Sequence, residues 1–369
     1  MRTTGSTAAT APMFALWKEH AEEARRHFVE WWEHRGLVLT IGGGGSVPPR
    51  AEAPDPGPPP SIEAKYIDVS WRTRRNLAAL ARSPLFGDTL PIADTNIGPG
   101  SLALLIGSSP NFTESTVWYD PRPEEPEAYP RLRFDPANRW WKVHEDLLAS
   151  LVRAAEGRFL VGCPDLIENI DILVSLRGME NVLTDMLDRP EWVEARVWEI
   201  NEVFFEAYRR VYDIVRLPDG SSCFSAFHLW APGTVAKVQC DASAAFSPAM
   251  FKRFVVPALT AQCEWLDYSM YHLDGTQAVC HLDLLLDIAP LDAIEWTPQS
   301  GLPGGGSPRW FDLYRRILNA GKSVQAVGVA AHEVVPLLDA VGPKGLYVST
   351  HCQSPEQAER LLRDTERFR

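Results

Sequence analysis

The sequence predicts an α/β protein whose main part is a (β/α)8 barrel, preceded by an N-terminal extension that is largely helical. Short apolar runs and helical segments alternate from Leu90 to the C-terminal residue, as they do in folds with a parallel sheet. Many of the apolar runs end on polar residues, and ligands of such barrels bind at the carboxyl ends of the strands. No GxGxxG sequence opens a helix, so a dinucleotide-binding half is not indicated.

The extension is predicted to cover residues 1–85 and the barrel domain residues 86–369. Two helices and one strand of the extension are expected at 14–33, 61–85 and 37–41. A glycine run, 42–45, and a proline-rich stretch, 48–60, lie between these elements. No Lys-Ser or Lys-Thr pair follows the glycine run, so we interpret this region as a flexible linker rather than a phosphate-binding loop.

In the barrel domain, the strand candidates are short apolar runs and the helix candidates have apolar side chains at helical spacing. Strands are expected, in chain order, at 90–93, 102–106, 158–162, 223–229, 268–274, 291–294, 323–327 and 345–350. Helices are expected at 136–156, 167–177, 179–187, 191–214, 247–266, 282–288, 308–320, 332–340 and 354–367. Ser247 and Ser354 each precede a proline, which is the pattern of an N-cap followed by the first helical residue.

Composition narrows the class of function. The chain has 369 residues, 45% of them hydrophobic, so it can bury a full core. Its net charge of −12 argues against a general nucleic-acid binder. The six cysteines form no CxxC pair and the N-terminus lacks a signal-peptide apolar core, so we expect a cytoplasmic protein. Because there is no run of about 20 apolar residues, no membrane span is expected. The sequence predicts no oligomeric state.

The candidate site lies in and around residues 268–298. His272 and Asp274 close one expected strand, Glu295 closes the next, and His351 and Cys352 follow the last one. Imidazole, carboxylate and thiolate are the ligands that zinc prefers. Adjacent residues of a strand point to opposite faces, so either His351 or Cys352 is expected to face the site. We expect a metal site made of His272, Asp274, Glu295 and Cys352.

Further residues at or just beyond strand ends are expected to line a substrate pocket. These are Asp165, His228, Trp230, Gln239, Asp241, Tyr271, Trp296 and Gln325. Trp230 and Trp296 are expected to form an apolar wall that excludes water from the pocket. Asp94, which closes an early strand, is expected to share a cavity with His272 and to take part in catalysis with His272 and Asp274. Cys280 and His281 resemble a metal pair in sequence, but they fall on an expected helix, so we interpret them as packing residues.

Four stretches carry a resemblance to a known group of proteins: SPAMFKRFVVPAL (247–259), MYHLDG (270–275), LDAIEW (291–296) and YVSTHCQSPEQAERLL (347–362). Through them, residues 85–369 resemble the uroporphyrinogen decarboxylase superfamily, and within it a bacterial branch described only as decarboxylase-like. That superfamily of TIM barrels also holds zinc-dependent methyltransferases that act on thiols, including corrinoid:coenzyme M methyltransferases and cobalamin-independent methionine synthase.

The resemblance implies two different sets of site residues. In the decarboxylase, an arginine-rich motif, an early aspartate and a tyrosine hold the substrate; Asp94 matches the aspartate, whereas the arginine motif and the tyrosine have no counterpart. The methyltransferases use His-x-Cys, in some members a glutamate at the next strand end, and a cysteine at the last strand. His272, Glu295 and Cys352 match that order, but Asp274 stands where the family has a cysteine. A carboxylate there makes the site harder, so it would bind zinc less tightly or admit manganese or iron.

We therefore expect a zinc-dependent methyl- or alkyl-transferase that activates a small thiol, and the resemblance allows a corrinoid protein as its partner. One alternative is a metal-free lyase or decarboxylase acting on a small carboxylated substrate, with His272, Asp274 and Asp94 transferring protons. A further alternative is a non-catalytic barrel that binds a corrinoid or another small molecule. Metal content separates the first hypothesis from the other two.

Overall fold

The computed structural model describes residues 16–121 and 125–369, and a seven-stranded sheet lies at its centre. All but one of its strands run parallel. Their spatial order is β1 (Leu37–Gly43), β13 (Leu346–Cys352), β12 (Ser323–Ala330), β11 (Ala293–Thr297), β10 (Tyr268–Asp274) and β9 (Val235–Gln239). The exception is β2 (Phe86–Gly87), which pairs antiparallel with β1 at the edge of the sheet.

Six shorter strands form three pairs outside this sheet. They are β3 (Ile92–Ala93) with β6 (Leu160–Val161), β4 (Ser109–Phe112) with β5 (Val117–Asp120), and β7 (Ser222–Phe224) with β8 (Leu229–Ala231). A single parallel bridge, Cys163 to Phe224, connects the end of β6 to β7. The predicted α/β class with a parallel sheet is confirmed. The hydrogen-bonded ladders of the described residues do not by themselves make a closed (β/α)8 barrel.

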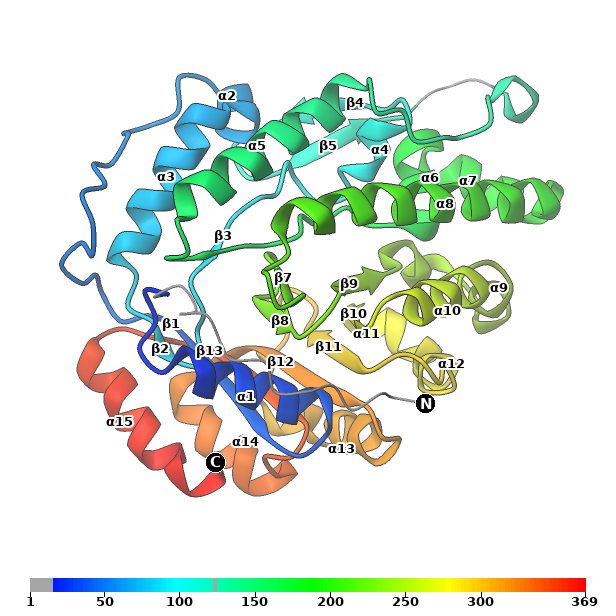
Figure 1. The fold of residues 1–369 in the computed structure, drawn as a ribbon. Coiled ribbons are helices and arrows are strands. Elements are labelled where there is room, and N and C mark those ends of the chain that lie inside the picture. Colours follow the sequence, from blue (N-terminus) through cyan, green and yellow to red (C-terminus); the bar gives the residue numbers. More distant parts are fainter. Residues whose placement is uncertain (1–15, 122–124) are drawn as a thin grey trace.

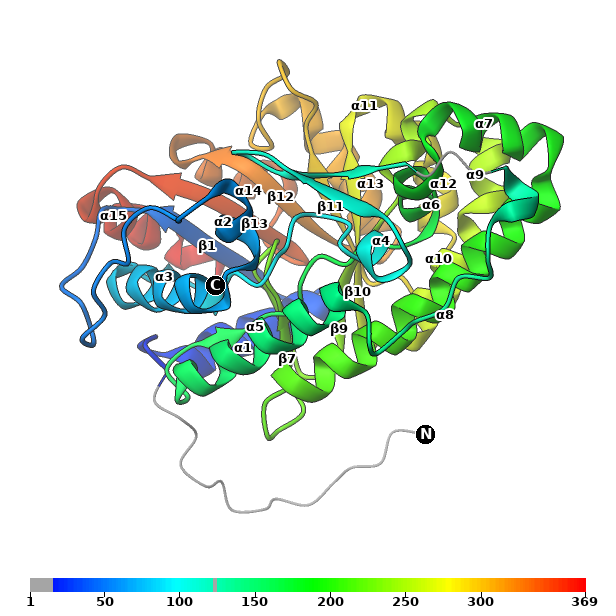
Figure 2. The same ribbon diagram turned by 90° about the horizontal axis from the view of Figure 1, so that it is seen from above.

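Helices cover the outside of the sheet and its edges (Figure 1). In chain order they are α1 (Ala21–Trp32), α2 (Ile62–Ile67), α3 (Val69–Arg82), α4 (Leu102–Leu105), α5 (Arg139–Ala155), α6 (Asn169–Arg177), α7 (Met179–Asp188), α8 (Pro190–Val215), α9 (Pro248–Phe254), α10 (Val256–Trp265), α11 (Gly275–Ala278), α12 (Leu282–Leu286), α13 (Phe311–Asn319), α14 (Val334–Val341) and α15 (Pro355–Thr365). The long helices α5 and α8 pack side by side (Figure 2). As predicted, the Ser247 and Ser354 hydroxyls cap α9 and α15.

Two of the predicted strands have a different conformation. Residues 102–105 form the short helix α4, whose side chains are all buried. A fully buried apolar run carries no periodicity, and its leucines and alanine are strong helix formers. Residues 223–229 do not make one strand, because the chain turns back at 225–228 between β7 and β8. His228 there has φ 51°, which no strand allows.

Residues assigned to the extension supply part of the central structure. The strand β1 pairs with β13 over its whole length, from Leu37 opposite Leu346 to Gly43 opposite Cys352. Helix α1 buries Trp31 and Trp32 against the amino ends of the strands. The Trp31 indole donates to the Val324 carbonyl at 3.2 Å. Helix α1 therefore covers the end of the sheet opposite to the carboxyl ends of the strands.

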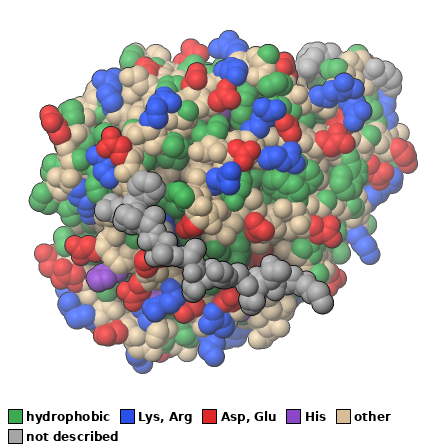
Figure 3. Space-filling model, in the orientation of Figure 1, with side chains coloured by type: hydrophobic (Ala, Val, Ile, Leu, Met, Phe, Trp, Pro, Cys, Tyr) green, Lys and Arg blue, Asp and Glu red, His purple; other side chains and the backbone are tan. Residues whose placement is uncertain are grey.

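The surface carries charges of both signs. On the face shown in Figure 3, acidic and basic side chains are interspersed with apolar ones. In the part of the chain that the structure describes, every helix is either too short or too polar to cross a membrane.

Candidate functional site

The polar side chains of the candidate site come from alternate positions of the parallel strands. Residues two apart in a strand point to the same face. The register places one polar row across five neighbouring strands: Gln239, His272, Glu295, Gln325 and Tyr347. Nearer the carboxyl ends, Asp274 lies beside Thr297, and His351 lies beside Gly42. The inner face of the sheet is therefore polar at its carboxyl end, and we call this end of the inner face the mouth.

Two of these side chains and Asp241, which lies just after β9, form a group suited to a metal ion. Asp241, His272 and Asp274 each offer one ligand atom, and these atoms all lie within 4.8 Å of one another. The His272 Nε2 atom is 4.0 Å from a carboxylate oxygen of Asp241. The sequence predicted His272 and Asp274 as ligands, whereas Asp241 was expected only in the substrate pocket. Two carboxylates and one imidazole suit zinc, manganese or iron, so the donor set fits a divalent ion.

Glu295 lies behind His272 and is fully buried. Its carboxylate is hydrogen-bonded to His272 Nδ1, and its other oxygen accepts from the Thr297 hydroxyl at 2.7 Å. Burial by itself would lower the pKa of His272, but the Glu295 carboxylate outweighs this effect and the pKa is raised. Since Nδ1 is engaged, Nε2 is the atom left to face Asp241 and Asp274. Glu295 therefore fixes the orientation of the His272 ring, as outer carboxylates do for the histidines of metal centres.

Asp241 is held in an acidic environment. Gln239 Nε2 donates to Asp241 at 2.9 Å and to Asp171 at 3.0 Å. The Asp171 carboxylate also accepts from the backbone N–H of Asp241 at 2.8 Å. Burial and the neighbouring Asp171 raise the pKa of Asp241 to about 6. A cation at this position would relieve the repulsion between the two carboxylates.

A buried ion pair lies beneath this group, and the sequence analysis did not predict it. Lys237 Nζ is 2.8 Å from Asp165 and is also hydrogen-bonded to Gln239. Burial would lower the pKa of Lys237, but Asp165 and Glu168 raise it. The available signal was a lysine inside the otherwise apolar run 235–238, because a buried lysine requires a partner. Lys237 fixes Gln239, and Gln239 in turn holds Asp241.

The turn between β7 and β8, residues 225–228, projects into the inner side of the sheet. We call it the tip. Gln325 Nε2 donates to the Phe227 carbonyl at 3.1 Å, and the Tyr347 hydroxyl lies 3.4 Å and 3.3 Å from the Phe227 and His228 carbonyls. The Phe227 ring centre is 5.1 Å from that of His272. Gln325, which was expected in the substrate pocket, is buried near the amino end of β12, where it helps Tyr347 to hold the tip against His272.

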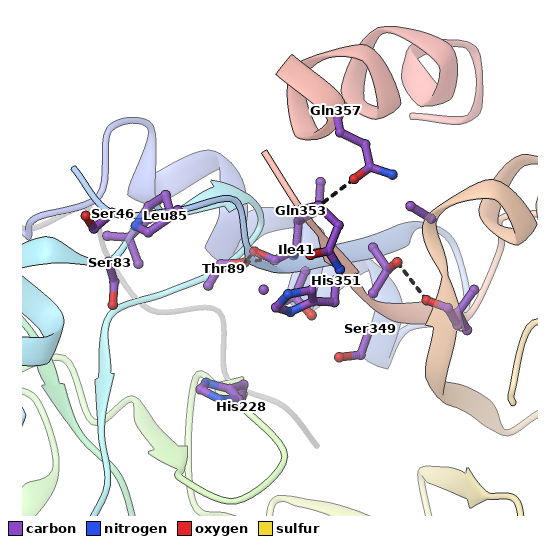
Figure 4. Close-up of a pocket in the computed structure, with 18 of the residues that line it drawn as sticks. Ile41, Ser46, Ser83, Leu85, Thr89, His228, Ser349, His351, Gln353 and Gln357 are labelled. Atoms are coloured by element: carbon purple, nitrogen blue, oxygen red, sulfur yellow. Dashed lines mark hydrogen bonds between the residues drawn. The ribbon is translucent and has the colours of Figure 1, made fainter. Parts of the chain in front are cut away.

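A cavity of about 1020 Å³ opens on the other side of the tip. It is lined by the ends of β1, β12 and β13, by part of residues 79–92 and by His228. His351 and Ser349 lie across the cavity from His228 (Figure 4). His351 is exposed to this space, whereas Cys352 points to the opposite face and is completely buried. His351, rather than Cys352, therefore faces this cavity, and no cysteine among the described residues belongs to the metal group.

The glycine run packs against His351. A Cβ atom at Gly43 would lie 2.3 Å from His351 Cε1 and 2.5 Å from the Cys352 carbonyl oxygen. Gly43 also has φ 70°, which favours glycine. Gly42 and Gly43 therefore belong to the end of β1, and Gly43 makes room for the imidazole, a role that differs from the expected flexible linker.

Three predicted pocket residues lie away from the mouth. Trp296 is buried against Trp310, with ring centres 5.0 Å apart. Tyr271 is also buried, and like Trp296 it points to the outer face of the sheet. Trp230 packs near α1, where its carbonyl accepts from the Trp32 indole at 2.9 Å. Odd and even positions of a strand cannot be assigned to the inner and outer faces without the register. The expected wall of Trp230 and Trp296 is therefore not formed.

Asp94 is exposed and does not join the metal group. It pairs with the buried Arg72 at 3.2 Å. Asp94 nevertheless affects the charge of His228. Burial lowers the pKa of His228, and the Asp94 carboxylate opposes that effect. Cys280 and His281 do not reach the mouth; the His281 ring stacks on Phe251 with centres 4.3 Å apart. That contact is the packing role expected for His281.

No family model matches this chain, and no curated protein matches it significantly. The functional assignment therefore depends on the residues of the site and on the resemblance described above.

Proposed function

We propose that this protein is a divalent-metal-dependent enzyme that holds its ion with Asp241, His272 and Asp274. The observation that carries the proposal is that three donors of suitable type lie within 4.8 Å of one another, next to a buried glutamate on the second nitrogen of the histidine. Only three protein donors are involved, which is the usual number at a catalytic site that leaves a position for substrate. Zinc is the ion we expect. Manganese and iron would compete for the site, because two of its three ligands are hard carboxylate oxygens.

The reaction we propose is methyl or alkyl transfer to a small thiol, in line with the resemblance to the zinc-dependent branch of the uroporphyrinogen decarboxylase superfamily. A divalent ion lowers the pKa of a thiol bound to it, so that the thiolate exists at neutral pH. His272 presents Nε2 because Glu295 engages Nδ1. Phe227 covers one side of His272 and reduces the access of water. A corrinoid protein as the methyl donor remains part of this proposal.

We also propose that the strands close into a (β/α)8 barrel. The bridge from Cys163 to Phe224 connects β6 to β7, and β7 packs against β9 at the edge of the large sheet. In this arrangement β1 is a barrel strand, and the metal group and the cavity share one mouth.

Elemental analysis of protein purified without chelators and then supplied with zinc, manganese or iron(II) tests the metal site. Wild-type protein should hold about one ion per chain, and His272→Ala and Asp241→Asn should each remove most of it. Cys352→Ser is the matched control, because Cys352 is buried on the opposite face; this variant should keep its metal. A wild-type protein without stoichiometric metal, or a Cys352→Ser variant that loses it, would contradict the proposed ligands.

A second candidate is a metal-free lyase or decarboxylase on a small carboxylated substrate. The pKa of Asp241 is about 6, so this group can exchange protons close to neutral pH, and the raised pKa of His272 favours an imidazole that can act as an acid. Turnover that persists after the metal has been removed by a chelator would favour this candidate over the metal-dependent one.

A further inference from the structure

The cavity beside the tip differs in charge from the rest of the molecule. The chain contains 48 Asp and Glu against 36 Lys and Arg. Among the described residues that line the cavity, none is an aspartate or a glutamate, whereas three are histidines and one is an arginine. Serine, threonine and glutamine side chains supply further hydrogen-bond donors. A cavity of this composition in an acidic protein is suited to a negatively charged ligand.

The histidines are held in place by specific features of the backbone. His351 lies over the end of β1, where Gly43 leaves space for its ring. His228 itself has φ 51°, in the left-handed region that few residues other than glycine adopt. Gln325 and Tyr347 fix that conformation through the carbonyls of the tip. His228 and His351 then face the same space from opposite sides (Figure 4).

The tip also connects the cavity to the metal group. Phe227 contacts the ring of His272, and the next residue, His228, lines the cavity. A ligand that extends from the cavity across the tip would have its other end at Asp241, His272 and Asp274. The cavity itself is not lined by these three residues, and its volume matches that of small-molecule sites, about 300–1,000 Å³, so it can hold the end of the ligand that lies between His228 and His351.

We propose that this cavity binds the acidic end, a carboxylate or a phosphate group, of the substrate whose reacting end lies at the metal group, and that His228 and His351 determine the specificity for it. The location of the reacting end depends on the proposed function above. The binding of the acidic group depends only on the cavity.

Anion binding to the whole protein tests the proposal. Calorimetric titrations with inorganic phosphate, with succinate and with uncharged succinamide should give saturable binding of at least one anion and none of the amide. Preference between phosphate and succinate identifies the acidic group. His351→Asn and His228→Asn should each weaken the binding by about tenfold or more, because each replaces an imidazole that can carry a positive charge with a shorter, neutral amide. Asparagine tolerates the positive φ at position 228.

The control is His20→Asn. His20 is exposed and has φ 56°, but it lies at the start of α1, away from the cavity, so its replacement should leave anion binding unchanged. Thermal melts of all three variants check that they fold. Lack of anion binding by wild-type protein, equal binding of succinamide, or unchanged binding by both folded cavity variants would overturn the proposal. Metal content measured on the same samples separates this failure from that of the proposed function, because His228 and His351 are not in the metal group.

Discussion

Glu295 shows how a buried residue can define the chemistry of an accessible one. His272 is at the mouth, but its proton affinity and ring orientation are set by a carboxylate with no exposed surface. The pair is most stable when the imidazole is protonated or carries a metal on Nε2, because either positive charge offsets the buried carboxylate. The sequence predicted Glu295 as a ligand, but Glu295 is not in the group Asp241, His272 and Asp274, and its carboxylate engages His272 Nδ1 instead.

Glu295→Gln should therefore lower the pKa of His272 in metal-free protein. Wild-type His272, whose pKa is raised on folding, stabilises the fold below the ordinary histidine pKa of 6.5, and this contribution is lost as the pH rises through the raised value. The variant should lose that pH dependence and bind metal about 10- to 100-fold more weakly. Titration of the His272 ring protons by NMR measures the first effect. An unchanged His272 titration in the variant would show that the carboxylate does not control it.

Asp241 changes stability in the same direction with pH as His272, but over a lower pH range, because burial and Asp171 disfavour its ionised form. Its pKa is raised to about 6 in the folded protein, so ionising it costs stability, and the stability of metal-free protein should fall as the pH rises from about 4 to about 6. Asp241→Asn should then stabilise metal-free protein at pH 7.5 by about 1 kcal/mol, a figure kept small because 48% of the side chain is exposed. At pH 4 the two proteins should melt alike. Thermal melts in chelator at both pH values decide this, and a variant that is less stable at pH 7.5 would refute it.

At the scale of elements, the tip is the part of the mouth that the sequence could not predict. Its residues look like one apolar strand, and the bonds that hold them as a turn come from residues far away in the chain, among them Gln325 and Tyr347, about a hundred residues away. The pairing of Asp241 with His272 had the same difficulty, because it depends on the register of β9 against β10. Strand ends with polar residues were visible in the sequence, and they led correctly to the row that contains His272 and Glu295.

Tyr347→Phe should loosen the tip. The change removes the hydroxyl that contacts the Phe227 and His228 carbonyls, so it should cost about 1 kcal/mol and speed hydrogen exchange at residues 225–228. Tyr314→Phe is the control, since Tyr314 is equally buried but donates to Gly305 on the outer side. It should lower stability to a similar degree without changing exchange at the tip. Equal exchange at the tip in both variants would mean that Tyr347 does not hold it.

At the scale of the molecule, the cavity depends on bringing the two ends of the chain together. The metal group comes from β10 and the turn after β9, whereas the cavity needs β1 beside β13. Local patterns predicted that strands would alternate with helices, but they could not show that a strand near the N-terminus pairs with the last strand. That contact joins residues about 300 positions apart, and only the three-dimensional fold determines it.

A chain that starts at residue 86 should therefore fail to fold, although residues 86–369 contain every predicted ligand. Without residues 1–85, β13 loses its partner from Leu37 to Gly43 and becomes an unpaired edge, and the apolar surface under Trp31 and Trp32 is exposed to water. In the full chain, Trp31→Ala should cost about 3–5 kcal/mol, whereas Trp198→Ala, at a site that is 45% exposed, should cost under about 1 kcal/mol. Denaturant unfolding of the two variants and of the shortened chain measures this. Cooperative unfolding of residues 86–369 alone would show that the fold does not require β1 and α1. That shortened chain would still lack the β1 residues that line the cavity.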